Sequence, residues 1–195
     1  MKLLLIILLF LFSCNGEIPV TDNRLWTKGI IPYTMDGFSV DEEDIILNTM
    51  SEWEFKTLYV IQFIEKVEQD KYLSIKKGCE NSFKSNNIIF DGQKLSKISK
   101  HEIGHALGLK HEHQRPDRDK YIKLICYGYY STDHDFKKLE LTDYIYNPLN
   151  YEYNYDSIMH YPLHFFMILL NESKVITEPH ITETDAQIVI DMYSN

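Results

Sequence analysis

The sequence predicts an α+β domain in which a mixed sheet and a central helix lie above a cleft, followed by a loop-rich lower half and a C-terminal helix. Three observations predict this fold class. Short strand-like runs recur up to residue 90, and a helical pattern covers 95–109. The residues beyond it are irregular and rich in Tyr until a final helical segment. At 195 residues, the chain is long enough for one domain with its own core.

The first predicted elements are a strand and a helix. Ile30–Met35 has strand composition, and Pro32 within it indicates an edge position in the sheet. Ser39 with Glu42 three residues later forms a capping box, which opens a helix. The apolar positions of this helix follow helical spacing: Ile45, Ile46, Met50, Trp53 and Leu58.

The remaining elements alternate in type along the chain. The runs 59–64, 72–75 and 87–90 read as strands, because they combine β-branched and aromatic residues over short lengths. Leu95–Leu109 repeats apolar residues at helical spacing and forms the second helix. A final short helix is expected from about Thr184 to Tyr193.

Residues 1–14 have the pattern of a secretory signal peptide. Lys2 precedes ten uninterrupted apolar residues, which is about half the length that crosses a bilayer. We therefore expect an exported protein with no transmembrane span, a short segment at 15–24 and the folded domain at 25–195. In a bacterial source the signal can instead end before Cys14, whose lipidation would anchor the protein at the cell surface.

Composition and cysteine count limit the other classes. The formal net charge of −9 without a block of Lys and Arg argues against nucleic-acid binding. Cys79 and Cys126 remain after the signal and can pair in an oxidising compartment, but neither has the spacing of a metal-ligand pair. Both are interpreted as structural. Nothing in the sequence indicates the oligomeric state.

A histidine and glutamate constellation stands on the second helix and the turn after it. His101 and His105 are four residues apart, so their rings lie on one helix face and can bind one ion. Glu102 lies about 100° around the axis, where it can act on a water without binding the ion. Gly108 ends the helix and lets His111 return as the third ligand. Three imidazoles and an open position are typical of a catalytic site with one Zn²⁺ per chain.

The segment from His101 to Asp119 resembles the zinc-binding segment of the astacin family, whose third histidine is followed by Glu, then Arg, then Asp-Arg-Asp. Tyr155–Tyr161 resembles the Met-turn of that family. Leu25–Tyr33 is similar to the start of its mature catalytic domain, and Asp185–Tyr193 to its C-terminal helix. The resemblance extends over residues 25–193 and implies a metzincin-like zinc peptidase domain.

The resemblance also implies roles for residues outside the metal ligands. Met159 is expected under the three imidazoles, and Tyr161 is expected to bind zinc at rest and then to hydrogen-bond the oxyanion. Glu112 anchors a newly freed N-terminus in the family, whereas the residue by itself suggests a solvated carboxylate. Asp117 and Asp119 are interpreted as loop-fixing hydrogen bonders. The other histidines match no ligand role and are interpreted as surface or packing residues: His113, His134, His160, His164 and His180.

The chain departs from the family pattern in three places. Cys79 matches one disulfide position without its expected partner, and Leu58 stands where the other bridge would begin, so we expect the core to carry more of the stability. Little room precedes Trp26 for a pro-segment, so we expect activity on export. The loop 162–166 also differs, which leaves the cleavage specificity open.

These observations predict a secreted zinc-dependent endopeptidase that acts on proteins or peptides. Metal-activated water attacks the peptide bond with Glu102 as general base. The extended substrate is expected to pair with an edge strand near Asn87–Phe90. One alternative is a zinc-stabilised, catalytically inactive surface binding module on the same scaffold. Another is hydrolysis of a non-peptide amide.

Overall fold

The computed structural model describes most of the residues that follow the predicted signal peptide. It describes residues 24–78, 82–84, 86–90, 95–125, 136–161, 167–171 and 178–194, with backbone alone for 82–84. The predicted signal peptide, the three cysteines, the loop 162–166, His134 and His164 lie outside these residues, and so the predictions about them stay predictions.

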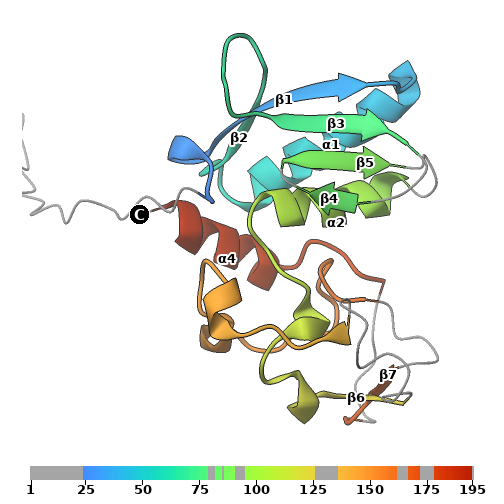
Figure 1. The fold of residues 1–195 in the computed structure, drawn as a ribbon, viewed down its shortest axis with the longest axis vertical. Helices are drawn as coiled ribbons and strands as arrows, with labels where there is room; N and C mark the ends of the chain where they lie inside the picture. The colour runs from blue at the N-terminus through green and yellow to red at the C-terminus, as the bar shows by residue number, and fades with distance from the viewer. Residues whose placement is uncertain are drawn as a thin grey trace, which may run out of the picture.

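A mixed sheet forms the upper half of the molecule (Figure 1). Its described strands run in the order β2-β1-β3-β5-β4, and all neighbours are parallel except β4 and β5. The mixed sheet of the predicted α+β class is thereby confirmed. The strands are β1 (Ile30–Asp36), β2 (Gln62–Glu65), β3 (Leu73–Lys77), β4 (Ser82–Lys84) and β5 (Asn87–Phe90).

The structure contradicts one prediction about sheet edges and makes another more precise. β1 lies between β2 and β3, so Pro32 is not on an edge strand. Because β3 pairs with β1 only from Tyr33 onward, Pro32 comes before the β3 ladder begins and the sheet tolerates its missing N–H. The edge strand expected near Asn87–Phe90 is β4, which pairs with β5 at the edge of the described sheet. With three residues, β4 is too short for a sequence pattern to reveal.

The first long helix, α1 (Val40–Lys56), begins at the predicted capping box. The Ser39 hydroxyl accepts the Glu42 N–H, and the Glu42 carboxylate accepts the Ser39 N–H at 2.8 Å. These two bonds satisfy two backbone donors that the start of a helix leaves without an intrahelical partner.

The buried face of α1 contains three of the predicted apolar positions. Ile46 and Trp53 have no exposed surface, and Met50 is 2% exposed. Ile45 is 36% exposed, because it lies one residue off the buried stripe. Leu58 lies in the turn beyond the helix at φ 54 and is 74% exposed. Ile45 therefore lies on the helix as predicted but outside the core, and the prediction that Leu58 belongs to this helix was wrong.

The helix α2 (Leu95–Ala106) packs against α1 and the sheet, and it ends three residues before the predicted Leu109. The Trp53 indole N–H donates to the Lys100 carbonyl at 3.1 Å, and the hydroxyl oxygens of Thr49 and Ser99 lie 3.0 Å apart. These polar contacts fix how α1 and α2 pack against each other around the fully buried core.

Between α2 and α4 (Glu183–Tyr193), the residues that the structure describes are mostly irregular, as predicted. The sequence did not predict the small antiparallel pair β6 (Ile122–Leu124) and β7 (Met167–Leu169). Short 3-10 turns connect the rest: Thr27–Gly29, Glu112–Gln114, Arg118–Lys120, Leu141–Asp143 and Pro148–Asn150.

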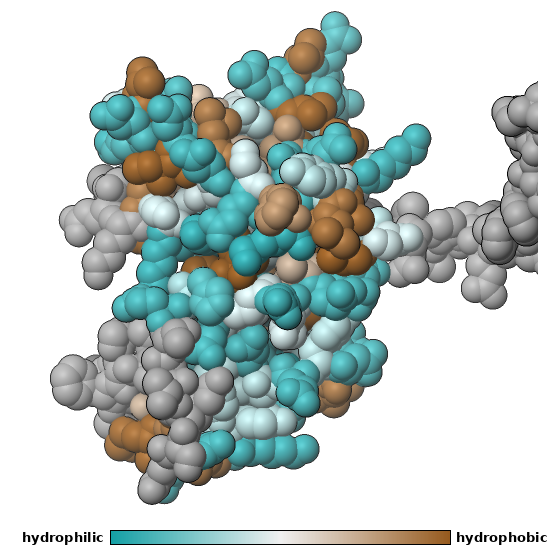
Figure 2. Space-filling view, turned by 180° about the vertical axis from the view of Figure 1, so that it is seen from behind, coloured by the Kyte–Doolittle hydropathy of each residue, from teal (hydrophilic) through white to brown (hydrophobic). Residues whose placement is uncertain are grey.

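Seen from behind, the surface carries mostly hydrophilic residues, with apolar residues in separate groups (Figure 2). Exposed apolar side chains scattered in this way are normal for a folded domain. Within the described ranges, no helix combines the length and the apolar character that crossing a membrane requires.

Removing the cap of α1 tests whether the capping box sets the start of that helix. We expect Ser39→Ala to lower the free energy of unfolding by about 1 kcal/mol, because the Glu42 N–H loses the side-chain oxygen that accepts it. Urea unfolding followed by circular dichroism measures the change. Ser51→Ala on the exposed face of the same helix should leave stability unchanged or raise it slightly. Equal losses in both variants would contradict the capping role.

Candidate metal centre

The end of α2 turns the chain so that His111 comes back towards the helix. The Leu109 N–H donates to the Gly104 carbonyl and the Gly108 N–H to the His105 carbonyl, both at 3.0 Å. This pair of bonds is the Schellman ending of a helix. Gly108 has φ 109, a conformation that residues with a side chain rarely adopt. The predicted glycine turn is thereby confirmed.

Side chains from both ends of the described chain satisfy the last carbonyl groups of α2. The Trp26 indole N–H donates to the Ala106 carbonyl at 2.7 Å. The Tyr193 hydroxyl donates to the Leu107 carbonyl at 3.1 Å. A helix end leaves such carbonyls without an intrahelical partner, so these two bonds hold the end of the histidine-bearing helix in place.

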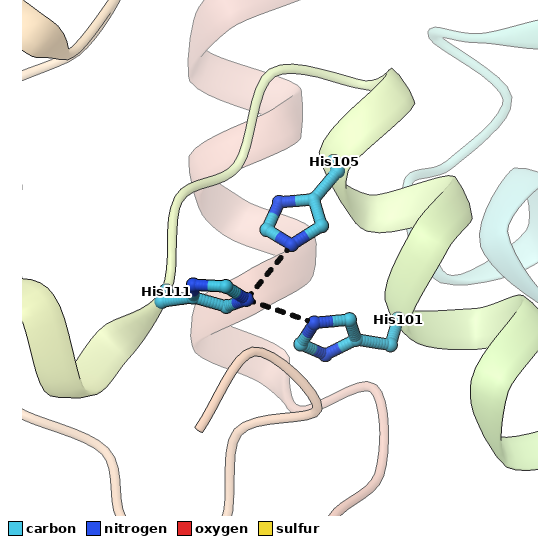
Figure 3. Close-up of side chains that lie close together, drawn as sticks. All are labelled: His101, His105 and His111. Atoms are coloured by element: carbon cyan, nitrogen blue, oxygen red, sulfur yellow. Dashed lines mark hydrogen bonds between the residues drawn. The ribbon is translucent and has the colours of Figure 1, made fainter. Parts of the chain in front are cut away.

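The three histidine rings converge through their Nε2 atoms (Figure 3). The Nε2 atom of His111 lies 3.1 Å from that of His101 and 3.0 Å from that of His105. Nitrogen ligands of a tetrahedral zinc ion, at about 2.0–2.1 Å from the metal, lie about 3.3 Å from one another. The spacing of the three donors therefore fits a small divalent ion.

The outer nitrogen of each ring determines where its proton lies. Each Nδ1 is within hydrogen-bond distance of an oxygen that only accepts: Ile158 O for His101 at 2.7 Å, Leu109 O for His105 at 3.0 Å, and Gln114 Oε1 for His111 at 2.8 Å. Nδ1 must therefore carry the proton, which leaves the Nε2 lone pair free. Three such lone pairs that face one another form the donor set of a cation site, and outer hydrogen bonds of this kind orient metal-binding histidines.

Burial keeps the three imidazoles neutral. Desolvation lowers the pKa of His101, lowers that of His105 further below its ordinary value, and lowers that of His111 to about 3. Glu102, on the same helix, is 7% exposed, and burial raises its pKa to about 7. A carboxyl group with a pKa near neutrality is matched to proton transfer at physiological pH.

A glycine in α2 lets the turn that contains Met159 approach the helix. A Cβ at Gly104 would lie 2.6 Å from the Met159 sulfur and 3.3 Å from the Trp53 ring. Met159 is 1% exposed, and its carbonyl accepts the Glu112 N–H at 3.0 Å. No sequence pattern assigned Gly104 a role, because its small size matters only once Met159 lies against it.

Asp185 connects α4 to the same turn, a role that the sequence did not indicate. Its carboxylate accepts the Ser157 hydroxyl at 2.6 Å and the Thr182 hydroxyl at 2.8 Å, and the Ile158 N–H lies 3.4 Å away. The Ile158 carbonyl is the acceptor for His101 Nδ1. Through this chain of bonds, α4 supports the first histidine.

Tyr161 follows the Met159 turn and lies beside the histidine cluster. Its ring centroid is 4.6 Å from that of His111 and 6.3 Å from that of His101. Its ring also packs at 4.2 Å on His113, whose Nδ1 lies 3.4 Å from the Tyr161 N–H. The Tyr161 ring is thereby placed beside two rings of the histidine cluster, and its catalytic role stays a prediction.

Glu112 is buried at 7% exposure, so the interpretation as a solvated carboxylate was wrong. It accepts the Arg115 guanidinium at 3.0 Å and the Asn154 N–H at 2.8 Å. Burial raises the pKa of Glu112 to about 7, while the Arg115 charge opposes the shift. The N-terminal residues that the family resemblance pairs with this carboxylate lie outside the described chain.

The two aspartates of the segment hold the loop, as predicted. Asp117 accepts two bonds from Arg115, at 3.0 and 3.1 Å. Asp119 accepts bonds from Lys138 at 2.6 Å and from Arg118 at 3.3 Å. Both carboxylates thus tie together side chains of the described segments 112–120 and 136–138.

The described histidines outside the cluster pack or face solvent, as predicted. His113 has no exposed surface, and its carbonyl accepts Arg118 at 2.9 Å. His160 is buried, with Nε2 2.8 Å from the Tyr153 hydroxyl. His180 is exposed and lies 3.1 Å from the Glu178 carbonyl.

Comparison with known proteins places this chain in a family. The chain matches the peptidase family described as Astacin over residues 19–186. It is 34% identical over 160 residues to an astacin-like metalloendopeptidase of Coturnix japonica and 32% identical over 154 residues to bone morphogenetic protein 1 of Xenopus laevis. These alignments cover 76% and 73% of this chain but only 37% and 21% of the relatives, so the chain spans less than half of their length.

Solved structures agree with this result. High choriolytic enzyme 1, a hatching enzyme zinc-protease from Oryzias latipes, superposes with a TM-score of 0.69 at 25% identity and covers 89% of this chain and 92% of its own. Myroilysin shares the fold with a TM-score of 0.63 at 21% identity, over 89% of this chain and 97% of its own. The chain therefore belongs to the astacin family and has a metzincin-like zinc peptidase domain.

Proposed function

We propose that this chain is a secreted endopeptidase that binds one zinc ion through His101, His105 and His111. The observation that carries the proposal is the convergence of three Nε2 atoms whose rings are each held through Nδ1 by an acceptor. Neutral imidazoles with inward lone pairs are the ligand set of catalytic zinc sites, which keep a further position for substrate or water.

The chemistry proposed for the site is hydrolysis of a peptide bond. Bound zinc supplies a Lewis acid that polarises the scissile carbonyl and activates a water. Glu102 removes a proton from the attacking water and delivers it to the leaving amine. The Tyr161 hydroxyl donates a hydrogen bond to the oxygen on which negative charge develops.

The extended substrate is proposed to pair with β4 (Ser82–Lys84) and not with Asn87–Phe90. β4 is the strand at the edge of the described sheet, and both β4 and β5 adjoin α2. Main-chain pairing along an edge strand binds peptides of varied sequence. This arrangement would lay a peptide along the helix that carries His101 and His105.

Export through a signal peptide at 1–14 remains part of the proposal. The uninterrupted apolar run after Lys2 supports it. Lipidation at Cys14 is the alternative that would keep the protein at a cell surface.

Removing a ligand tests the metal site. We expect His105→Ala to lose stoichiometric zinc and casein cleavage together, because two imidazoles bind zinc far more weakly than three. Inductively coupled plasma mass spectrometry measures the metal. His180→Ala, a histidine on the surface, should keep both. Activity of the wild type should be lost with 1,10-phenanthroline and return with added zinc. Full zinc content in His105→Ala would refute the assigned ligand set.

Replacing the general base distinguishes an enzyme from a zinc-stabilised binding module. We expect Glu102→Gln to bind zinc normally and to lower kcat by about 10²–10⁴-fold, because the amide cannot take the proton. Turnover of a fluorogenic peptide measures the loss. Glu68→Gln, an exposed change of the same kind, is the control and should retain full turnover. Wild-type kcat in Glu102→Gln would exclude the general-base role, and a zinc-loaded wild type without turnover would favour the binding module.

Removing one hydroxyl tests the proposed oxyanion contact. We expect Tyr161→Phe to lower kcat by about 10²-fold with little change in KM or zinc content, since the lost bond forms mainly in the transition state. Tyr59→Phe, at a 58% exposed tyrosine, should match the wild type. A Tyr161→Phe enzyme with unchanged kcat would assign Tyr161 to packing alone.

A further inference from the structure

Gln114 lies three residues after the third histidine. Its side-chain amide and its backbone carbonyl all have hydrogen-bond partners. Its Oε1 lies 2.8 Å from His111 Nδ1, and its Nε2 donates to the Lys137 carbonyl at 3.2 Å. Its backbone carbonyl accepts the Leu139 N–H at 2.8 Å. The residue is 6% exposed. A buried amide held in this way has one orientation and little freedom to leave it.

The Lys137 carbonyl determines which end of the amide faces the histidine. A carbonyl oxygen only accepts, so the amide must turn its NH₂ towards Lys137 and its oxygen towards His111. The oxygen in turn accepts only, so His111 must carry its proton on Nδ1. The Nε2 lone pair is then free on the side where His101 and His105 lie. A backbone group 26 residues away in sequence thereby sets the tautomer of His111 through one side chain.

The three rings differ in how they are supported. The acceptors for His101 and His105 are backbone carbonyls, of Ile158 and Leu109, which any residue at those positions would supply. The acceptor for His111 is a side chain. Among the three rings, His111 is therefore the one whose outer hydrogen bond a single substitution can remove without altering the backbone.

We propose that Gln114 is a positioning residue for the metal centre, which holds His111 as an Nδ1-protonated ligand and ties it to the segment 136–140. The proposal rests on the zinc site proposed above. Outer hydrogen bonds to metal-binding histidines fix ring orientation and raise ligand basicity, and their removal typically weakens metal binding 10–100-fold. Gln114 touches neither substrate nor metal in this role.

Two substitutions separate the acceptor from the donor. Gln114→Leu removes both hydrogen bonds at similar size, and we expect its zinc dissociation constant to rise about 10–100-fold. Gln114→Glu keeps an oxygen for His111 and loses the donor to Lys137, so its zinc dissociation constant should stay within a few-fold of the wild type. Competition with a chromophoric zinc chelator measures both constants without any reference to turnover.

The control is Gln187→Leu, the same change at an exposed glutamine whose Nε2 donates to Asp191 on α4. It should bind zinc as the wild type does. Urea unfolding of the metal-free proteins reports any loss of fold in Gln114→Leu, and in that event the comparison of Gln114→Glu with the wild type decides. Wild-type affinity in a folded Gln114→Leu, or an equal loss in both Gln114 variants, would overturn the positioning role. A wild-type chain that binds no zinc would instead overturn the proposed function.

Discussion

The hydrogen bonds on the outer side of the three imidazoles are the interactions on which the rest of the site depends. They place the protons on Nδ1 and direct three lone pairs to one point among half-buried rings. Leaving a buried acceptor without a partner costs about 1–3 kcal/mol, so three facing acceptors are unfavourable as a purely structural arrangement. Zinc bound by histidine and cysteine ligands in small domains contributes about 10–16 kcal/mol at neutral pH, which is larger than that cost. Bound zinc would therefore stabilise an arrangement that is unfavourable without a metal.

The upper and lower halves of the molecule are joined at this centre. α2 supplies His101 and His105 from above, and the chain beyond Gly108 supplies His111 from below. The turn of the lower half that contains Met159 packs against α2, where the absence of a side chain at Gly104 leaves space for the Met159 sulfur. Asp185 holds that turn to α4, and α4 in turn reaches the end of α2 through Tyr193. These contacts connect both halves to the three histidines, so both halves together determine how the three rings lie.

The sequence predicted the parts of the fold that local patterns determine, and it missed those that depend on distant partners. The capping box at Ser39, the glycine turn at Gly108 and the four-residue histidine spacing are local, and the structure confirms them. Pro32 suggested an edge strand because proline lacks the N–H that an inner strand usually needs. In the structure, the ladder between β1 and β3 starts only at Tyr33, which no local pattern indicates. Glu112 suggested a solvated carboxylate because its burial depends on Arg115 and Asn154 arriving from elsewhere. Gly104 and Asp185 matter through contacts with Met159 and Ser157, which no spacing rule contains.

Arg115, in the charged segment 112–119, has a structural role. Arg115 is 2% exposed, and its five N–H donors are all used: two by Asp117, one by Glu112, and one each by the carbonyls of Tyr151 and Glu152. A guanidinium in this state has no donor left for a substrate carbonyl or an oxyanion. A lysine could not replace it, because three donors on one nitrogen cannot match a planar set of five. Breaking a buried pair of this kind costs about 3–5 kcal/mol, so loss of Arg115 would loosen the lower half that holds His111 and Tyr161. Glu102, which is buried on α2, takes no part in this network, and burial raises its pKa to about 7.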